Sequence, residues 1–381
     1  MKIALVRQKY SDFGGAERYL ASLAEHLAQS EHEIHLFASE WRVEGQKPSH
    51  NHHYIKFHRV PVVRGLSVCE VMTFALNARR LLRRESFDII HSFERTLYQD
   101  VFRAGDGCHR EWLIQRKKID PFYKTVMHTF NPLHISLLWI EKKIFTEGNY
   151  KMIIANSSRG KAEIMRHYGV PGDKIEVIYN PVDTERFRSE VRDDEALNVR
   201  KSFGISSGDK IILFVGSGFK RKGLAAAIQS MAYLDNHIRM IVVGKDRIKQ
   251  YRSMAQRLGV EKRIHFAGPV SGVEKFYRAS DMLVFPTIYE PFGNVCLEAI
   301  ASGLPVVVSR ICGASEILTE GANGYIIEDP LDAREIAEKV KKGLALDRKT
   351  MEEVNAGLLE RFTWERHASQ VLDIYKRIFR N

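Results

Sequence analysis

Two glutamates eight residues apart, Glu290 and Glu298, are the pair whose type and spacing best suit chemistry on a bound ligand. An apolar run of strand length ends at Pro286, and a helical pattern begins near Asn294. Glu290 is therefore expected on a loop and Glu298 within the first two turns of a helix. Both lie near the carboxyl end of a strand, where open α/β sheets bind ligands. Carboxylates there can bind sugar hydroxyls, while Gly293 and Asn294 offer backbone N–H groups to a phosphate.

A glycine loop followed by three consecutive cations forms a second candidate site. Residues 214–223 read FVGSGFKRKG, so Lys220, Arg221 and Lys222 follow the loop that begins at Gly216. Cations held beside backbone N–H groups suit a diphosphate. The order G-x-x-x-x-G-K-[ST] of a P-loop is absent, which disfavours ATP hydrolysis.

An earlier turn, Phe13-Gly14-Gly15, joins the first strand-like run to an apolar helix pattern. Paired glycines let a backbone approach a ligand at a helix N-terminus, although a simple tight turn explains them equally well. The spacing is not G-x-G-x-x-G, so a dinucleotide-binding dehydrogenase loses its main support.

Other side chains that could do chemistry are better explained without it. The four histidines of residues 50–58 have no accompanying carboxylate or cysteine, so a solvated loop is favoured over a metal site. Cys296 and Cys312 have no nearby histidine to activate them and are expected to be small buried apolar residues. The chain contains no D-x-D carboxylate pair, so no metal is expected to be required.

Strand-length apolar runs alternate with helix-length amphipathic segments, which is the pattern of βαβ units around parallel sheets. The expected strands are residues 3–6, 33–38, 54–60, 88–92, 101–104, 152–155 and 174–179, then 211–215, 240–243, 264–267, 282–285, 305–309 and 324–327. Asn180-Pro181 ends the first series, and a charge-rich segment poor in apolar residues follows. We expect two Rossmann-like α/β domains, residues 1–183 and 184–362, with a C-terminal helix, 363–381, packing back; a surface loop within one domain is the alternative at the boundary.

The net charge of +11 comes from 58 Lys and Arg residues against 47 Asp and Glu residues. It is nearly equal on either side of Asp183, but in the first half it is concentrated in residues 79–143, which hold 13 basic and 8 acidic residues. Aromatic and leucine residues interleave with these cations, as in segments that contact an anionic membrane surface. A solvated helix face over an ordinary core is the alternative. Nucleic acid is disfavoured because no recognised binding module accompanies the patch.

Neither a signal peptide nor a membrane span is expected. The apolar run of residues 1–6 is too short for the first, and no stretch approaches the roughly 20 uncharged apolar residues of the second. The four cysteines are far apart in the sequence, as is typical of a reduced cytosolic protein. A cytoplasmic location follows, with membrane contact expected to be peripheral, on the inner face of the cell membrane.

Four of these features together resemble the GT4 family of retaining glycosyltransferases, which have the GT-B fold of two Rossmann-like domains facing across a cleft. They are the pair Glu290-x7-Glu298, the loop 216–223, the Phe13-Gly-Gly turn and the junction Asn180-Pro-Val-Asp183. Within that family, three details are similar to the lipopolysaccharide-core glucosyltransferases: Arg18 after the Phe13-Gly-Gly turn, Gly216-Ser217 in place of the commoner Gly-Arg, and the run Arg221-Lys222-Gly223. The resemblance is strong over residues 210–330 and weaker over residues 40–150, where acceptor-binding parts diverge.

The resemblance implies a nucleotide-sugar donor, usually linked to UDP, bound mainly by the C-terminal domain. Glu298 would bind the ribose hydroxyls, and Arg221 and Lys222 the diphosphate. Glu290, with the N–H groups of residues 292–295, would bind the donor sugar hydroxyls and phosphate. The other members of the implied donor site are Gly15, whose loop would meet the diphosphate, and Gly216, Phe292, Gly293, Asn294 and Val295.

The catalytic group implied by the resemblance is Glu290, Arg221, Lys222 and Asp106. Asp106 falls where the family places a polar side chain, often histidine, facing the reacting sugar, and His109 is the alternative. Without a metal, the two cations and helix-end N–H groups would stabilise the leaving diphosphate. The implied reaction retains the anomeric configuration by attack on the same face of the sugar.

The expected function is transfer of a hexose from a nucleotide sugar to a lipopolysaccharide-core, lipid-linked or polysaccharide acceptor. The expected partners are that donor, that acceptor and an anionic membrane surface, with no nucleic acid. Two alternatives stay open: a nucleotide-sugar epimerase of the same fold, and a non-catalytic module that binds membranes or polyanions.

Overall fold

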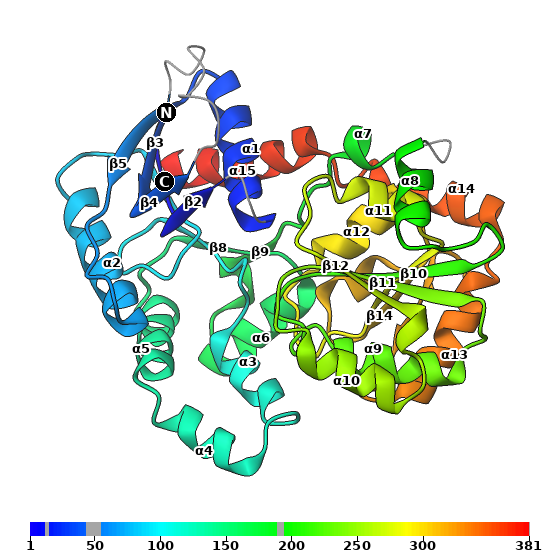
Figure 1. The fold of residues 1–381 in the computed structure, drawn as a ribbon. Helices are drawn as coiled ribbons and strands as arrows, with labels where there is room; N and C mark the ends of the chain where they lie inside the picture. The colour runs from blue at the N-terminus through cyan, green and yellow to red at the C-terminus, as the bar shows by residue number, and fades with distance from the viewer. Residues whose placement is uncertain (12–14, 43–54, 189–193, 381) are drawn as a thin grey trace. The chain divides into compact units, whose positions relative to one another are not determined.

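The computed structural model describes residues 1–11, 15–42, 55–188 and 194–380. The chain divides into two compact units, and it passes from one to the other twice (Figure 1). Unit 1 is Met1–Asn180 with Trp364–Asn381, and unit 2 is Pro181–Thr363. The first crossing therefore lies at Asn180 and Pro181, just before the boundary expected at Asp183.

Unit 1 is built around parallel strands. Its strands are β1 (Lys2–Val6), β2 (Lys9–Ser11), β3 (Glu33–Ala38), β4 (Glu40–Arg42), β5 (Ile55–Arg59), β6 (Ile89–Ser92), β7 (Val101–Arg103), β8 (Met152–Ala155) and β9 (Ile175–Val177). Its helices are α1 (Gly15–Gln29), α2 (Ser67–Leu82), α3 (His109–Arg116), α4 (Phe122–Thr129), α5 (Pro132–Thr146), α6 (Ser158–Tyr168) and α15 (Trp364–Arg380).

The main sheet of unit 1 has the order β5-β3-β1-β6-β7-β8-β9, and every pair in it is parallel. The order reverses between β1 and β6, so the carboxyl ends of these two strands form the switch point where such sheets bind ligands. A small parallel pair, β2 with β4, lies outside this sheet. Neither of its strands was expected, because both are three residues long and mostly polar.

Helices cover both faces of the unit 1 sheet. On one face, α1 and α15 share a core with β1 and β3, in which Leu20, Leu23, Val371, Ile374 and Tyr375 are buried. On the other face, α2, α5 and α6 contribute to two further buried clusters. The last helix of the chain is thus part of the first unit.

Unit 2 repeats the same design. Its strands are β10 (Lys210–Val215), β11 (Ile238–Val243), β12 (Ile264–Gly268), β13 (Met282–Phe285), β14 (Val306–Ser309) and β15 (Gly324–Ile327). Its helices are α7 (Thr184–Phe187), α8 (Asp194–Ser202), α9 (Leu224–Ser230), α10 (Lys249–Arg257), α11 (Glu274–Ala279), α12 (Asn294–Ala301), α13 (Ala333–Leu344) and α14 (Arg348–Leu359).

The sheet of unit 2 has the order β12-β11-β10-β13-β14-β15, again parallel throughout, with its switch point between β10 and β13. The strands are nearly continuous apolar runs because helices cover both faces of the sheet. In β10, the five residues after Lys210 are all buried. Every strand of both sheets that was expected from the sequence is therefore present, and the expectation of two parallel α/β sheets is confirmed. None of the described helices combines the length and the apolar character needed to span a bilayer.

Candidate active site

The candidate site residues of unit 2 come together at its switch point. One loop follows β10 and contains Gly216, Arg221 and Lys222, and the other follows β13 and contains Glu290. The carboxyl ends of β10 and β13 are adjacent because these strands pair with each other. The topology alone therefore brings together two loops that are about seventy residues apart in the chain.

Glu290 is held by both cations that the sequence assigned to a diphosphate. Its Oε2 atom accepts a hydrogen bond of 2.8 Å from Arg221 and a second, short one from Lys222. The Lys222 ammonium is buried and also lies over the Phe285 ring, 4.9 Å from its centroid. Burial alone would raise the pKa of Glu290, but the charges of Lys222 and Arg221 outweigh it and hold the pKa below its ordinary value. Glu290 is thus an ionised, oriented carboxylate.

Backbone contacts fix the two loops against each other. Ile288 donates its N–H to the Arg221 carbonyl at 2.8 Å, and the Arg221 guanidinium donates to the Tyr289 carbonyl at 3.0 Å. Gly223 permits this approach, because its φ is +78° and a Cβ atom there would lie 1.8 Å from the Pro286 carbonyl oxygen. The Lys-Gly step that ends the cation run is therefore required by close packing as well as by turn geometry.

Gly293 places the N-terminus of α12 beside Glu290. It is the N-cap residue with φ +96°, and a Cβ atom there would lie 2.7 Å from the Cys312 sulfur. Cys312 itself is buried and donates to the Phe292 carbonyl at 2.9 Å. The first helical residues, Asn294 and Val295, are half-buried and follow directly. Residues 292–295 thus lead from the loop after β13 into the N-terminus of α12, which begins at Asn294.

Glu298 lies one turn into α12, as expected, and it has a partner that the sequence did not reveal. The hydroxyl of Tyr277, on α11, donates to Glu298 Oε2 at 2.8 Å. Burial, with the Glu298 carboxylate close by, raises the pKa of Tyr277 well above its ordinary value, so the tyrosine remains a neutral donor. Tyr277 is fully buried and follows Phe276 in a short helix, where it reads as an ordinary core residue. No pattern in the sequence connects it with Glu298.

The glycine loop after β10 is braced by the segment that follows β11. Gly244 packs so closely that a Cβ atom there would lie 2.1 Å from the Gly216 carbonyl oxygen. The Asp246 carboxylate accepts the Phe219 N–H at 2.7 Å, and the Ser217 hydroxyl accepts the Lys245 N–H at 3.1 Å. Gly244 and Asp246 are further site-supporting residues that sequence reasoning missed, because their role appears only when β10 and β11 pair.

The expected site residues of unit 1 are described less completely. Gly15 begins α1, whereas Phe13 and Gly14 of the same turn lie outside the described residues. Asp106 is exposed on the loop after β7. His109 begins α3, and its ring contacts His134, with 3.1 Å between the nearest nitrogen atoms. Burial, with Arg95 nearby, lowers the pKa of His109 to about 4, so it is neutral near pH 7.

Two further acidic residues are associated with the loop that carries Asp106. The Glu141 carboxylate accepts the backbone N–H of His109 at 2.7 Å and a hydrogen bond from Arg95 at 3.2 Å, which fixes the start of α3. Glu94 follows β6 at the switch point, and burial together with the charge of Asp106 raises its pKa. Glu94 and Glu141 were not singled out in the sequence, because each stands alone among unrelated neighbours.

The models of two protein families match the chain. The model described as glycosyl transferases group 1 matches residues 196–356, and that of glycosyltransferase family 4 matches residues 13–186. Together they account for most of both units. Unit 1 therefore carries a glycosyltransferase family 4 domain, and unit 2 carries a glycosyl transferases group 1 domain. The resemblance drawn from the sequence is confirmed, and so is the expectation of an enzyme that transfers glycosyl groups.

Curated relatives of this glycosyltransferase have related activities. It is 25% identical to lipopolysaccharide glucosyltransferase WaaG of Escherichia coli (strain K12) over 348 residues, which are 90% of each chain. It is 33% identical to D-inositol 3-phosphate glycosyltransferase of Corynebacterium glutamicum (strain R) over 192 residues, 47% of this chain and 46% of that protein.

Solved structures of glycosyltransferases share its fold. The crystal structure of WaaG has a TM-score of 0.81 with 23% identity and covers 98% of this chain and 99% of its own. Anabaena Alr3699/HepE, solved in complex with UDP and glucose, has a TM-score of 0.76 with 18% identity and covers 99% of both chains. The GT-B fold expected from the sequence is confirmed.

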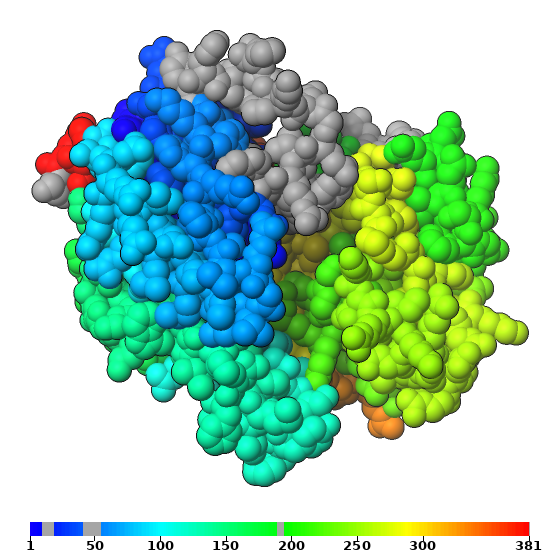
Figure 2. Space-filling model, turned by 60° about the vertical axis from the view of Figure 1, so that its left-hand side comes forward, coloured from blue at the N-terminus to red at the C-terminus, as the bar shows by residue number. Residues whose placement is uncertain are grey.

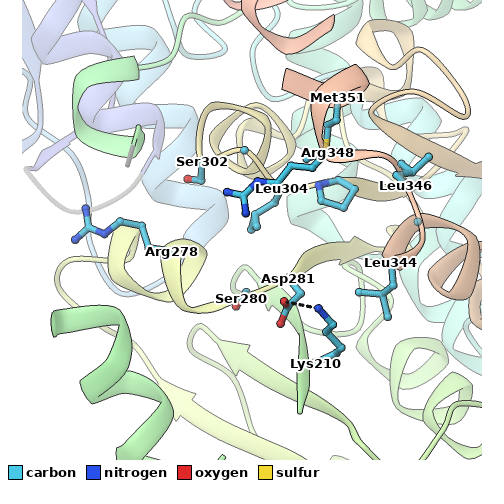
Figure 3. A pocket seen from close by; sticks show the side chains of 13 residues that line it. Lys210, Arg278, Ser280, Asp281, Ser302, Leu304, Leu344, Leu346, Arg348 and Met351 are labelled. Carbon is cyan, nitrogen blue, oxygen red and sulfur yellow. Dashed lines mark hydrogen bonds and ion pairs between the residues drawn. The ribbon is translucent and has the colours of Figure 1, made fainter. Parts of the chain in front are cut away.

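A separate pocket at the opposite, amino ends of the unit 2 strands lies away from this site. It has a volume of about 190 Å³ and is lined by Lys210, Arg278 and Arg348 among others (Figure 3). Each of these cations is already ion-paired: Lys210 with Asp281 at 3.4 Å, Arg278 with Glu195 at 2.9 Å and Arg348 with Glu352 at 3.1 Å. We therefore assign no ligand to this pocket.

The structure also shows the surroundings of His58, Cys296 and Cys312, which the sequence offered as further candidates for chemistry. His58 lies in β5, stacked on Phe37 with 4.4 Å between ring centroids, and not in a solvated loop; the other three histidines lie outside the described residues. Cys296 and Cys312 are fully buried, as expected. In the described ranges, no group of three or more His, Cys, Asp or Glu side chains is arranged to hold a metal ion.

Proposed function

We propose that this glycosyltransferase moves a hexose from a UDP-sugar to a lipopolysaccharide-core, lipid-linked or polysaccharide acceptor, with retention of configuration and without a metal. The observation that carries the proposal is the arrangement at the unit 2 switch point, where Glu290, Arg221, Lys222 and Glu298 converge on one loop–helix junction. The names of the relatives favour glucose as the sugar and lipopolysaccharide as the acceptor.

The ion pairs of Glu290 suit the release of a diphosphate. Arg221 and Lys222 are held in place by Glu290 before any ligand binds, so they do not need to reorganise when negative charge develops on a leaving group. The Arg221 side chain is about one-third exposed, which lets it contact a ligand while it remains paired. The N-terminus of α12 adds the positive end of a helix dipole at the same place.

Glu298 and Tyr277 suit the recognition of ribose. A carboxylate that a buried hydroxyl holds has a fixed orientation, and a carboxylate of fixed orientation can accept hydrogen bonds from a diol. On the unit 1 side, we propose that Gly15 meets the donor diphosphate and that Asp106 faces the reacting sugar. The His109 ring is hydrogen-bonded to His134, which favours Asp106 for that role.

A donor screen tests this proposal directly. The protein would be incubated with a panel of nucleotide sugars, and slow release of UDP or GDP would be followed with and without EDTA. We expect UDP release from one UDP-hexose, unchanged by EDTA. Release of an isomerised nucleotide sugar instead would indicate the epimerase, and loss of UDP release in EDTA would overturn the metal-independent mechanism.

Two variants test the site. Glu298→Ala should weaken UDP binding by roughly tenfold or more, since hydrogen bonds to a charged group contribute about 1.5–3 kcal/mol. Glu290→Ala should abolish sugar transfer, and thermal unfolding would show that the variant is folded. Glu338→Ala, an exposed glutamate of α13 paired with Lys342, is the matched control. If UDP binding and turnover were unchanged in the first two variants, the site would be elsewhere.

We also propose that the enzyme works at an anionic membrane surface, contacted through residues 79–143. Flotation with vesicles that contain anionic lipid, at low and high salt, measures this contact. Binding should weaken as salt rises, because screening removes the attraction between exposed charges. Equal binding to neutral vesicles at all salt concentrations would contradict an electrostatic contact.

A further inference from the structure

The helices α3, α4 and α5 form an unusual surface at one end of unit 1. None of the residues of α4 is buried, and the helix stands out from the rest of the unit (Figures 1 and 2). Large apolar side chains are exposed along it: Phe122 is 84% exposed, Met127 66% and Phe130 73%. A helix that keeps so much apolar surface in water lacks the core contacts that normally stabilise it.

Every acidic residue of this surface is buried and engaged. Residues 107–146 contain three acids, Glu111, Asp120 and Glu141, none of them more than 9% exposed. Each accepts a hydrogen bond from at least one arginine of unit 1. The charges that the three helices present outward are therefore cationic, and the exposed side chains between them are apolar.

A pocket opens among these three helices. It has a volume of about 320 Å³, at the small end of the range for ligand pockets. Its lining combines apolar side chains with cations and histidines and contains no acid: Arg110, Leu113, Ile114, Arg116, Lys117, Thr125, His128, Thr129, His134, Ile135 and Leu138. Such a pocket suits a ligand that is anionic at one end and apolar at the other.

The cations of the pocket differ in what they can offer. Arg116 and His128 both hydrogen-bond to the buried Asp120 carboxylate, at 2.7 and 3.0 Å, so both side chains are already engaged inside the protein. Arg110 and Lys117 are exposed at the rim of the pocket. They are the residues best placed to meet an incoming anion.

We propose that this pocket binds the phosphodiester head group of one anionic phospholipid, with the first methylene groups of its chains against Leu113, Ile114 and Leu138. The inference deepens the proposed membrane contact by naming its partner and rests on it. A lipid is favoured over a protein partner because the apolar residues of α4 and the cations beside them match a bilayer interface, where cations meet head groups and aromatic rings lie at the boundary. The pocket volume fits a head group rather than a whole lipid.

Calorimetric titration of the full chain with a monomeric short-chain lipid tests the pocket without a bilayer. The probe is dihexanoyl phosphatidylglycerol below its micelle concentration, and the second probe is its deacylated head group, glycerophosphoglycerol. We expect saturable binding of one lipid per chain and weaker binding of the deacylated compound. Equal affinity for both probes, or no saturable binding of the lipid, would overturn the proposal.

A pair of double variants separates the pocket from the general surface charge. Arg110→Gln with Lys117→Gln removes the two rim cations, whereas Lys118→Gln with Lys124→Gln removes two exposed cations of the same surface that do not line the pocket. The first pair should weaken binding of the monomeric lipid by roughly 25-fold, at about fivefold per cation. The second pair should leave it within a factor of about three, although both pairs should weaken vesicle flotation.

The outcomes also distinguish this inference from the proposed function. Equal loss of lipid binding in both pairs would mean a diffuse electrostatic contact and would refute the pocket. Displacement of the lipid by an amphipathic peptide with tighter affinity than any lipid would point to a protein partner instead. UDP binding, measured without lipid, should be unchanged in both pairs. If the parent chain did not bind UDP, that result would contradict the proposed donor site and would leave the lipid pocket untouched.

Discussion

Tyr277 is the residue that most changes the view of the donor site. Its hydroxyl fixes one oxygen of Glu298 from a fully buried position. It is therefore a positioning residue, which acts on a ligand only through the carboxylate that it orients.

Tyr277→Phe should weaken UDP binding by roughly three- to tenfold, less than Glu298→Ala, because the carboxylate remains but loses its orienting bond. Phenylalanine fills almost the same volume, so the free energy of unfolding should fall by only about 1 kcal/mol. Tyr375→Phe removes a buried hydroxyl from α15, in unit 1, and should leave UDP binding unchanged. Titration calorimetry with UDP measures the affinity of Tyr277→Phe, of Glu298→Ala and of the control. An unaltered affinity in Tyr277→Phe would show that Glu298 does not need this partner.

The sequence could indicate Glu290, Glu298 and the cations of the 216–223 loop, because their types and spacing are local. It could not show that Arg221 and Lys222 bind Glu290, since that contact depends on the pairing of β10 with β13. The same limit applies to Tyr277, Gly244 and Glu141. Each acts on a residue that is distant in the chain or on another element, so its role appears only in the folded protein.

At the scale of elements, the junction between β13 and α12 is the most constrained part of the site. Gly293 combines a positive φ with a close approach to Cys312. Gly303, just after the same helix, has φ +72°, but a Cβ atom added there would meet no other atom within 4 Å. A comparison of substitutions at the two glycines therefore distinguishes the cost of a left-handed backbone from the cost of a steric clash.

Gly293→Ala should destabilise the protein by more than Gly303→Ala, which should cost only about 1 kcal/mol from the left-handed backbone. The additional loss in Gly293→Ala reports the contact with the Cys312 sulfur and should be accompanied by weaker UDP binding, because the start of α12 must move. Urea unfolding and UDP titration of both variants make the comparison. Equal effects on stability would mean that the junction can relax.

The strands that could be predicted best from the sequence are those whose residues are nearly all apolar. Many strands of the two main sheets, such as β10, β11 and β13, are apolar runs that need no long-range information. The short strands β2 and β4 were missed because polar residues such as Lys9 and Glu40 carry no such signal. β2 follows β1 and β4 follows β3, so the pairing of β1 with β3 brings the two short strands side by side.

At the scale of the whole molecule, α15 makes unit 1 depend on the end of the chain. Tyr375 is fully buried against α1 and the sheet, and its hydroxyl lies 2.5 Å from His91 Nδ1. Removal of the Tyr375 side chain should therefore destabilise unit 1 and leave the stability of unit 2 unchanged.

Tyr375→Ala should reduce the stability of unit 1 by about 3–5 kcal/mol, as for other large-to-small core substitutions. Hydrogen exchange followed by mass spectrometry should then show faster exchange in residues 1–180 and unchanged protection in residues 181–363. Phe214→Ala, in the core of unit 2, should give the reverse. Loss of protection in both units from either variant would mean that they unfold as one.

His367 gives the same region a dependence on pH. Its Nδ1 lies 2.8 Å from the Tyr179 carbonyl oxygen and its Nε2 2.5 Å from the Tyr19 hydroxyl. Burial, with the nearby charge of Arg103, lowers the pKa of His367 to about 3. His367 therefore takes up a proton near pH 6.5 in the unfolded chain but only near pH 3 in the folded chain. The free energy of unfolding consequently falls as the pH drops from about 6.5 towards 3.

The His367→Gln variant should lose this dependence, because an amide can keep both hydrogen bonds and does not titrate. Between pH 7.5 and 5 the parent should lose about 2 kcal/mol more than the variant, at 1.36 kcal/mol for each pH unit below 6.5. Urea unfolding at the two pH values measures the difference. Parallel losses in both proteins would show that His367 is protonated in the folded state.

The double passage of the chain between the units has a consequence for synthesis on the ribosome. Residues 1–180 are translated first, but α15 is translated only after all of unit 2, so this part of unit 1 lacks one helix of its core while unit 2 is synthesised. At typical elongation rates this wait lasts roughly 10 to 40 s. During that time α15 does not cover its face of β1 and β3, so this apolar surface is available to chaperones and to aggregation.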